Sequence, residues 1–527
     1  MIERSFSRSA ALGIINPMMR ASSFGLRHRL FGFWALNFLG YVCLWWVLTL
    51  PKAFGPLVSN GWYPGSALAA WVARLPLHQT LAGQAATQRL LGVGVLVLMG
   101  GSYFATLVLA RRWQPSLRRL LLLTAGLALP LLVLPGLLSS DVYSYAMFGR
   151  IPLLYGGNPF IDVPLAFRDD PLLPLVAWKT TPSVYGPAWI IAALPLTALA
   201  QGMGGGAAAY VLVYKLAALA AHLATAAVMW AVVGRLSAAH QHWATLAYAW
   251  HPLPLIEFAG MGHNDALLGL ALALGVWYAI RHAPRRAVLA FTVAGMVKLV
   301  GLLVLPVYAL YLVRQLRWWQ KPRALLPFVA LSLGCIIVLY APFWDGPQTL
   351  RVLVTAPPLT EINKGPAARV LDDLVGRPCG LVPSDVTEGR NLRSRPNATC
   401  RAVWETRVRR VSLALFAVVY GVLLCWPAAT STALLARCGM ALLAYSLLGA
   451  LYFQPWYGVW LVLWAAWWRR ATWPLLAWGV ALLWLYPAYP FMERTLLAFA
   501  PLVAWPVVLG GRWLWRVLHA RRPAVAN

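Results

Sequence analysis

The sequence predicts an all-α polytopic membrane protein, a bundle of about 14 transmembrane helices with extracytoplasmic loops and interfacial helices. Three observations predict this fold class. The 527 residues are 61% hydrophobic and only 11% charged. Apolar runs of about 20 residues, the length that crosses a bilayer, recur along the chain. Lys and Arg gather in short clusters between these runs and not in one basic stripe, so the net charge of +29 indicates membrane topology and not a nucleic-acid partner.

The positive-inside rule assigns each loop to one side of the membrane, because basic clusters mark cytoplasmic loops. The clusters fall at 27–29, 111–119, 281–286, 314–323, 469–470 and 512–522. The apolar runs between them predict spans at 31–50, 90–110, 120–138, 209–233, 244–260, 266–281, 324–343, 411–428, 433–452, 473–488 and 495–510. A broken hairpin at 287–313 and a short span at 456–468 complete the count and leave both termini in the cytoplasm. The run 188–200 is expected to lie at the outer interface.

This order predicts four regions. They are a cytoplasmic N-terminal segment at 1–30, a transmembrane module at 31–343 with an outer loop at 139–186, an extracytoplasmic loop at 344–410, and C-terminal transmembrane helices with a short cytoplasmic tail at 411–527. Four cysteines, Cys43, Cys335, Cys425 and Cys438, are expected to be small core residues. Cys379 and Cys400 both fall in the second outer loop. Two alternatives remain for this pair, a disulfide bond or two free thiols.

Asp141 is the first of 14 acidic residues, out of 15, that this topology places on the outer side. It directly follows a hydrophobic run. The segment from Ser139 to Arg150 brings this acid, three aromatic rings and a guanidinium within one short stretch. A carboxylate held at one membrane surface indicates an active site.

Lys298 lies inside an apolar run, where the 287–313 hairpin should turn. Ionisable residues at such positions are costly, and interrupted membrane helices are tolerated where they line a cavity. The lysine can therefore reach an anionic headgroup or phosphate. The alternative is that Lys298 extends its side chain to the membrane interface.

Further polar residues fall at predicted outer turns. The triplet His263-Asn264-Asp265 could bind sugar hydroxyls, orient another acid or supply metal ligands. The alternative is that Asn264 and Asp265 only cap the following helix. Gln454 and Arg494 are the polar exceptions among outer aromatic residues that mainly anchor the protein at the membrane surface.

Taken together, these pieces resemble a known superfamily. The motifs are Asp141-Val142-Tyr143-Ser144-Tyr145, Gly149-Arg150, Gly157-Asn158-Pro159-Phe160, Tyr185-Gly186-Pro187, Gly262-His263-Asn264-Asp265, Val297-Lys298 and Gln454-Pro455-Trp456-Tyr457. The pattern is similar to the GT-C glycosyltransferases, and most of all to the polyprenol-phosphate-mannose-dependent α-1,6-mannosyltransferases of bacterial envelopes. An additional hairpin before Asp141 departs from the superfamily at large and fits this branch.

The resemblance implies a GT-C-like bundle in the bacterial inner membrane, with an extracytoplasmic active site. Such an enzyme moves a sugar, here expected to be mannose, with inversion from a polyprenyl-phosphate carrier to a hydroxyl of a lipid-linked or envelope glycan. Asp141 corresponds to the catalytic acid of the family. The implied partners are the lipid-linked donor, a glycan or glycolipid acceptor and membrane lipid, with no nucleic acid, and we expect a monomer.

The residues support the same chemistry independently. Inverting transfer needs one base, which Asp141 can supply, and a cation for the departing phosphate, which Lys298 or an arginine can supply. No P-loop or Rossmann signature indicates a nucleotide-sugar donor. No metal ligands are assigned and no cofactor is firmly implied, although a divalent metal stays open. The predicted substrate-binding residues are Tyr145, Arg150, Asn158, Tyr185, His263, Asn264, Asp265, Lys298, Gln454, Tyr457 and Arg494.

Two other functions remain open at this point. A lipid or solute transporter would favour repeat symmetry and polar residues near mid-membrane, and the sequence shows neither. A ligase or polymerase of lipid-linked glycans would use a pyrophosphate-linked donor.

Overall fold

The computed structural model describes residues 17–54, 57–63, 66–355, 398–425, 428–468 and 470–486, with the isolated positions 366, 381–382 and 395–396. Helices make up almost all of the regular structure. The strands within these ranges are one antiparallel pair, β1 (Leu381–Val382) and β2 (Arg395–Pro396). The predicted all-α class is therefore confirmed. Arg494, Cys379 and the Cys400 side chain lie outside the described residues, as do most acids of the second outer loop.

Five helices within the described ranges are long and apolar enough to cross a membrane. They are α4 (Ala85–Leu109), α8 (Ala207–Leu236), α14 (Lys321–Tyr340), α18 (Ala398–Cys425) and α19 (Ser431–Ala444), the third and fifth being extended by short turns to Phe343 and Gly449. Shorter apolar helices accompany them. The count of about 14 crossings stays a prediction.

The remaining helices are shorter than a full span, except for α1. They are α1 (Pro17–Val47), α2 (Ala67–Ala73), α3 (Pro76–Ala82), α5 (Leu117–Leu132), α6 (Asp141–Tyr155), α7 (Pro187–Gly202), α9 (Gln241–Ala249), α10 (Pro252–Leu255), α11 (Asp265–Ile280), α12 (Pro284–Val297), α13 (Val304–Leu312), α15 (Val352–Thr355), α20 (Gly458–Ala465) and α21 (Thr472–Leu482).

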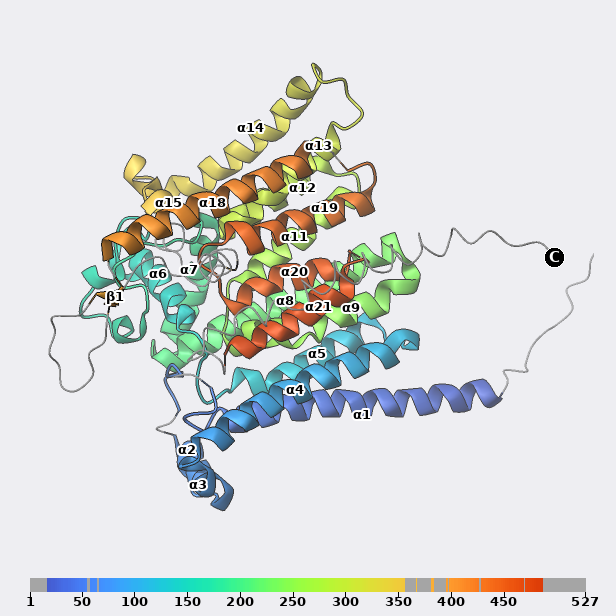
Figure 1. The fold of residues 1–527 in the computed structure, drawn as a ribbon, viewed down its shortest axis with the longest axis vertical. Helices are drawn as coiled ribbons and strands as arrows, with labels where there is room; N and C mark the ends of the chain where they lie inside the picture. The colour runs from blue at the N-terminus through green and yellow to red at the C-terminus, as the bar shows by residue number, and fades with distance from the viewer. Residues whose placement is uncertain are drawn as a thin grey trace, which may run out of the picture.

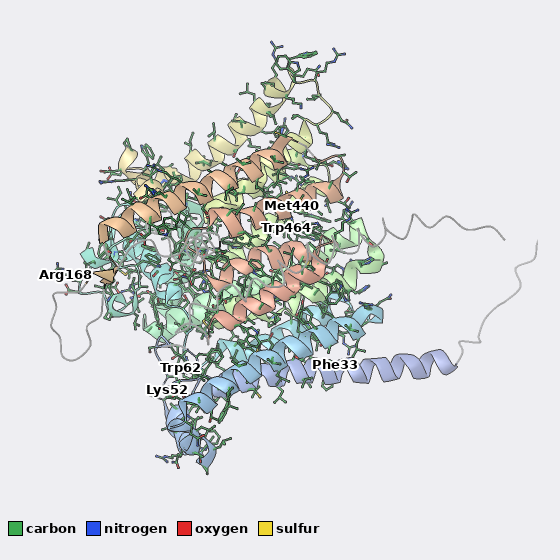
Figure 2. All side chains as sticks on the ribbon, viewed as in Figure 1. Phe33, Lys52, Trp62, Arg168, Met440 and Trp464 are labelled. Atoms are coloured by element: carbon green, nitrogen blue, oxygen red, sulfur yellow. The ribbon has the colours of Figure 1, made fainter. Side chains whose placement is uncertain are left out.

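The axes of the long helices are roughly aligned and form a bundle with two distinct ends (Figure 1). Helices α1, α4 and α5 lie along one side and α14 and α18 along the other, with α8, α11 and α20 between them. Helices α6 and α7 gather at one end, which we call the α6 end. Figure 2 shows Arg168 at this same end and Trp464 inside the bundle, where the indole is fully buried.

The predicted broken hairpin is confirmed. Helix α12 ends at Lys298, whose backbone is extended (φ −151°, ψ 128°), and a 3-10 turn then leads into α13. The end of α12 and the 3-10 turn that follows it pack closely at two glycines, which have no side chain. A Cβ on Gly301 would lie 2.6 Å from the Ala294 carbonyl carbon, and one on Gly295 would lie 2.3 Å from the Leu302 side chain. Glycine at both positions therefore allows the chain to fold back at Lys298.

The segment 139–186 differs from the predicted loop. Helix α5 ends at Leu132, and Asp141 is the first residue of the 15-residue helix α6, so the acid begins a helix instead of directly following one. Gly156 ends α6 in the left-handed region (φ 63°). The core prediction for the cysteines holds for Cys438, which is buried, but is wrong for Cys425, which is exposed near the end of α18.

Candidate active site

A tight turn at the α6 end positions three polar side chains. A π-helical turn, Ile256–Gly260, is followed by Gly262, which has a positive φ of 75°. The His263 amide then donates a hydrogen bond to the Glu257 carbonyl oxygen at 3.0 Å, and α11 begins at Asp265. Glu257, His263 and Asp265 are all buried. Buried polar groups need partners, so their contacts define the site.

Asp141 faces this turn from the start of α6. Its Oδ2 lies 3.9 Å from His263 Nδ1, and its backbone amide donates to Ser139 Oγ at 3.2 Å. Burial raises the pKa of the Asp141 carboxyl to about 6, while Lys298 lowers it and Asp265 raises it by smaller amounts. At neutral pH Asp141 is mostly ionised, with a pKa close to the working pH, which suits a general base.

His263 contacts three neighbours, of which Trp456 stacks on its ring and Tyr145 hydrogen-bonds to it. Its ring stacks on Trp456, with centroids 4.4 Å apart, and its Nδ1 lies 3.1 Å from the Tyr145 hydroxyl. Its Nε2 lies 3.3 Å from Glu257 Oε2, and the other oxygen of Glu257 accepts a 2.6 Å hydrogen bond from Tyr486. Burial lowers the pKa of His263 well below its usual range, so the ring is neutral at pH 7.

Lys298 turns inward and forms an ion pair. Its Nζ lies 2.9 Å and 3.1 Å from the two carboxylate oxygens of Asp265, and the Trp460 indole donates to the same carboxylate at 2.6 Å. The ammonium also lies over the Tyr457 ring, 4.8 Å from its centroid. The Lys298 side chain is 15% exposed. This geometry does not fit a lysine that extends to the membrane interface.

Asn264 does not act as a helix cap. Its side chain makes no capping hydrogen bond to α11. Both polar atoms of its amide are buried without a hydrogen-bond partner in the structure. The capping alternative is therefore wrong for Asn264.

Two cavities meet at Asp141. The first, which we call the lysine cavity, has a volume of about 80 Å³ and is lined by Lys298, Leu299, Val300, Val184, Tyr185, Tyr445, Tyr457 and Trp460. The second, the glutamine cavity, has a volume of about 260 Å³ and is lined by Val58, Leu138, Ser139, Ser140, Ala177, Gln454 and Tyr486. Both are also lined by Asp141, Trp178, Tyr452 and Trp456.

A model of the alpha-(1→6)-mannopyranosyltransferase family, N-terminal domain (MptA_B family), matches residues 49–314. The chain belongs to this family. No curated protein and no solved structure matched it in the same comparisons. The resemblance to α-1,6-mannosyltransferases is thus confirmed, and the protein is a mannosyltransferase.

The mannosyltransferase brings most of the predicted site residues together. Asp141, Tyr185, Lys298, Gln454 and Tyr457 line the two cavities. The predicted residues Tyr145, His263, Asn264 and Asp265 stand directly behind this lining or in the same turn.

Arg150 and Asn158 are not part of this cluster. Arg150 is buried, with its Nε 2.7 Å from Asp170 and its Nη1 2.6 Å from the Tyr210 hydroxyl. The Asn158 side-chain amide donates to the distant Phe343 carbonyl oxygen at 2.7 Å, and its Oδ1 accepts from the Phe160 amide at 3.1 Å, which closes a local turn. Both residues hold the segment after α6 in place.

Several residues of the mannosyltransferase site were missed. Trp456 adjoins the predicted Tyr457, and Trp460 follows one helical turn later, so helical spacing could have indicated both. Glu257 is an acid inside an apolar run, which is itself a sign of function. Tyr452 and Tyr486 fall in the outer aromatic stretches near Gln454 and Arg494, whereas Trp178 carries no comparable signal, because only the folded chain brings it to Asp141. Within the described ranges, no group of three or more His, Cys, Asp and Glu side chains could hold a metal ion.

Proposed function

We propose that the protein is an inverting GT-C mannosyltransferase that takes mannose from a polyprenyl-phosphate carrier and transfers it to a hydroxyl of a lipid-linked or envelope glycan. We place this reaction at the extracytoplasmic face of the bacterial inner membrane. The observation that carries the proposal is the position of Asp141 between two cavities of different character. One contains a lysine and an apolar rim, and the other contains hydroxyls and an amide.

The lysine cavity suits the donor. A lysine ammonium has three donor hydrogens, and the contacts of Lys298 with Asp265 leave part of the ammonium facing the cavity. Leu299 and Val300 follow it along the wall and offer apolar contact to the start of a polyprenyl chain. The aromatic rings of Tyr457 and Trp460, which also line this cavity, lie next to the ammonium and help to keep it in place.

The glutamine cavity suits the acceptor. Ser139, Ser140 and Gln454 present both donors and acceptors, as a sugar hydroxyl requires. The shared wall includes Trp178 and Trp456, whose flat rings can pack against a sugar ring.

The reaction then follows from this arrangement. Asp141 takes the proton of the acceptor hydroxyl, and the acceptor oxygen forms a bond to the anomeric carbon of mannose. The bond from that carbon to the phosphate oxygen breaks, and the phosphate leaves with the electron pair on the opposite side. Lys298 stabilises the charge that develops on the leaving phosphate in a site of low dielectric constant.

The experiment that tests this proposal supplies purified full-length protein with radiolabelled donors and membrane glycolipids as acceptor. Polyprenyl-phosphate-mannose, polyprenyl-phosphate-glucose and GDP-mannose are compared, and the anomeric configuration of the product is read by NMR. We expect transfer from the lipid-linked mannose with inversion. Transfer from GDP-mannose alone, or retention of configuration, would contradict the proposal. The family match favours this function over the transporter and the ligase or polymerase alternatives.

A further inference from the structure

A third cavity lies at the opposite end of the bundle from Asp141. It has a volume of about 490 Å³ and is lined by Arg111, Val233, Leu236, Ser237, Ala239, His240, Trp243, Ala244, Thr432, Ala466, Trp467, Thr472 and Trp473. Helix α8 joins the two ends. Its Tyr214 hydroxyl contacts the Tyr145 carbonyl oxygen near the active site, whereas Leu236 lines the third cavity. The 22 residues between them (236 − 214) span about 33 Å, close to the thickness of a bilayer core.

The polar groups around this cavity are suited to an anion. Arg111 is exposed and has no ion pair or hydrogen bond among the described residues. Trp467 is 5% exposed, lines the cavity, and leaves its indole Nε1 buried without a hydrogen-bond partner. No Asp or Glu lines the cavity. A buried N–H donor without an acceptor is costly, so a ligand that supplies an acceptor would be stabilised here.

The backbone adds to this preference. Helices α9, α19 and α21 all begin at the cavity, because lining residues fall in the first turns of each. The amino end of a helix carries a partial positive charge and free N–H groups, which favour phosphate and other anions. The first turns of three helices therefore lie beside the same space as Arg111.

The cavity also has an apolar side. The Trp243 and Trp473 rings meet edge to face with centroids 5.5 Å apart, and Trp473 remains 38% exposed. Indole rings favour the depth at which lipid headgroups meet acyl chains. A free anion would not use this surface, whereas the glycerol and upper acyl carbons of a lipid would.

We propose that this cavity binds the phosphate of an anionic phospholipid headgroup at the membrane surface opposite the active site. Basic pockets between membrane helices are known to hold such headgroups. The bound lipid would join Arg111, from the end of α4, to Trp467 and to the start of α21, and so tie the family-matched part of the chain to the C-terminal helices. The same phosphate chemistry could come from a soluble anion, and the test separates the two sources.

The test measures the thermal unfolding of purified full-length protein in uncharged detergent during titration with short-chain phosphatidylglycerol. Parallel titrations use phosphatidylcholine of the same chain length and inorganic phosphate. The variants are Arg111→Gln and Trp467→Phe, with Arg118→Gln as the control, since Arg118 is an exposed arginine at the same end that does not line the cavity.

We expect phosphatidylglycerol to raise Tm saturably and phosphatidylcholine to have little effect. Arg111→Gln should raise the half-saturating concentration about tenfold or more, Trp467→Phe several-fold, and Arg118→Gln by less than about twofold. If Arg111→Gln does not fold, the half-saturating concentration of Trp467→Phe alone tests the proposal. Unchanged saturation in the cavity variants, or equal stabilisation by phosphatidylcholine, would overturn the proposal. If inorganic phosphate alone reproduces the shift, the lipid source is wrong.

Discussion

The Asp141 carboxylate lies 3.9 Å from Nδ1 of His263, which joins the first residue of α6 to the turn before α11. His263 is in turn fixed by Trp456, Tyr145 and Glu257. The position of His263 beside Asp141 therefore depends on residues from three separate parts of the chain, and substitutions in each should affect the reaction differently.

The pH dependence should follow Asp141. The active form is the carboxylate, so activity is present above its pKa and is lost as the pH falls through about 6. We expect kcat/KM to decline tenfold per pH unit below that value. Because Lys298 lowers the pKa of Asp141, Lys298→Met should move this decline to higher pH. A pH profile of each protein measures both effects, and a flat profile between pH 4 and pH 8 would argue against Asp141 as the base.

Glu257 should act by positioning His263. Glu257→Ala removes the acceptor of the Tyr486 hydrogen bond and the neighbour of His263 Nε2, and we expect kcat to fall about tenfold with lower thermal stability. Glu257→Gln keeps an acceptor for Tyr486 and should recover most of kcat. The two variants are compared by kcat, KM and Tm. Equal loss of kcat in both, at unchanged Tm, would instead assign Glu257 a direct chemical role.

The ion pair between Lys298 and Asp265 complicates the simplest test of phosphate binding. Lys298→Met leaves the fully buried Asp265 carboxylate without its cation, which should cost about 3–5 kcal/mol of stability. The double variant Lys298→Met/Asp265→Asn removes both charges and should recover much of that stability. If Lys298 binds the donor phosphate, kcat/KM for the lipid donor stays about ten- to a hundredfold low in the double variant. Recovery of donor use together with Tm would show that Lys298 only neutralises Asp265.

Arg150 should matter for stability and not for the donor. Arg150→Met leaves Asp170 buried and unpaired, so we expect a loss of about 3–5 kcal/mol and a lower Tm, with KM for the donor unchanged. Arg168→Gln is the matched control, because Arg168 is an exposed arginine in the same segment. If Arg150→Met raised KM for the donor while its Tm stayed unchanged, Arg150 would instead be assigned to the phosphate site.

The sequence predicted those features that depend on local pattern. Lys298 stands out because it is charged within an apolar run flanked by glycines, and the structure places the helix break there. Arg150 was predicted to bind substrate, whereas the structure pairs it with Asp170, a contact that is visible only in the folded chain. The ion pair of Lys298 with Asp265 was missed for the same reason. Trp178 reaches Asp141 from a stretch without regular structure, which no periodicity predicts.

The central claim is that Asp141 is the base that activates the acceptor. Asp141→Asn keeps the shape of the side chain but removes its ability to take a proton at neutral pH. The exposed Asp169→Asn in the same segment makes the same change in charge and serves as the control.

The most direct measurement is single-turnover transfer from radiolabelled polyprenyl-phosphate-mannose, with donor binding measured in parallel. We predict that Asp141→Asn binds the donor within about threefold of the wild type but transfers at least about a thousandfold more slowly, while Asp169→Asn matches the wild type. Transfer by Asp141→Asn at a rate near that of the wild type would contradict the assignment of Asp141 as the catalytic base.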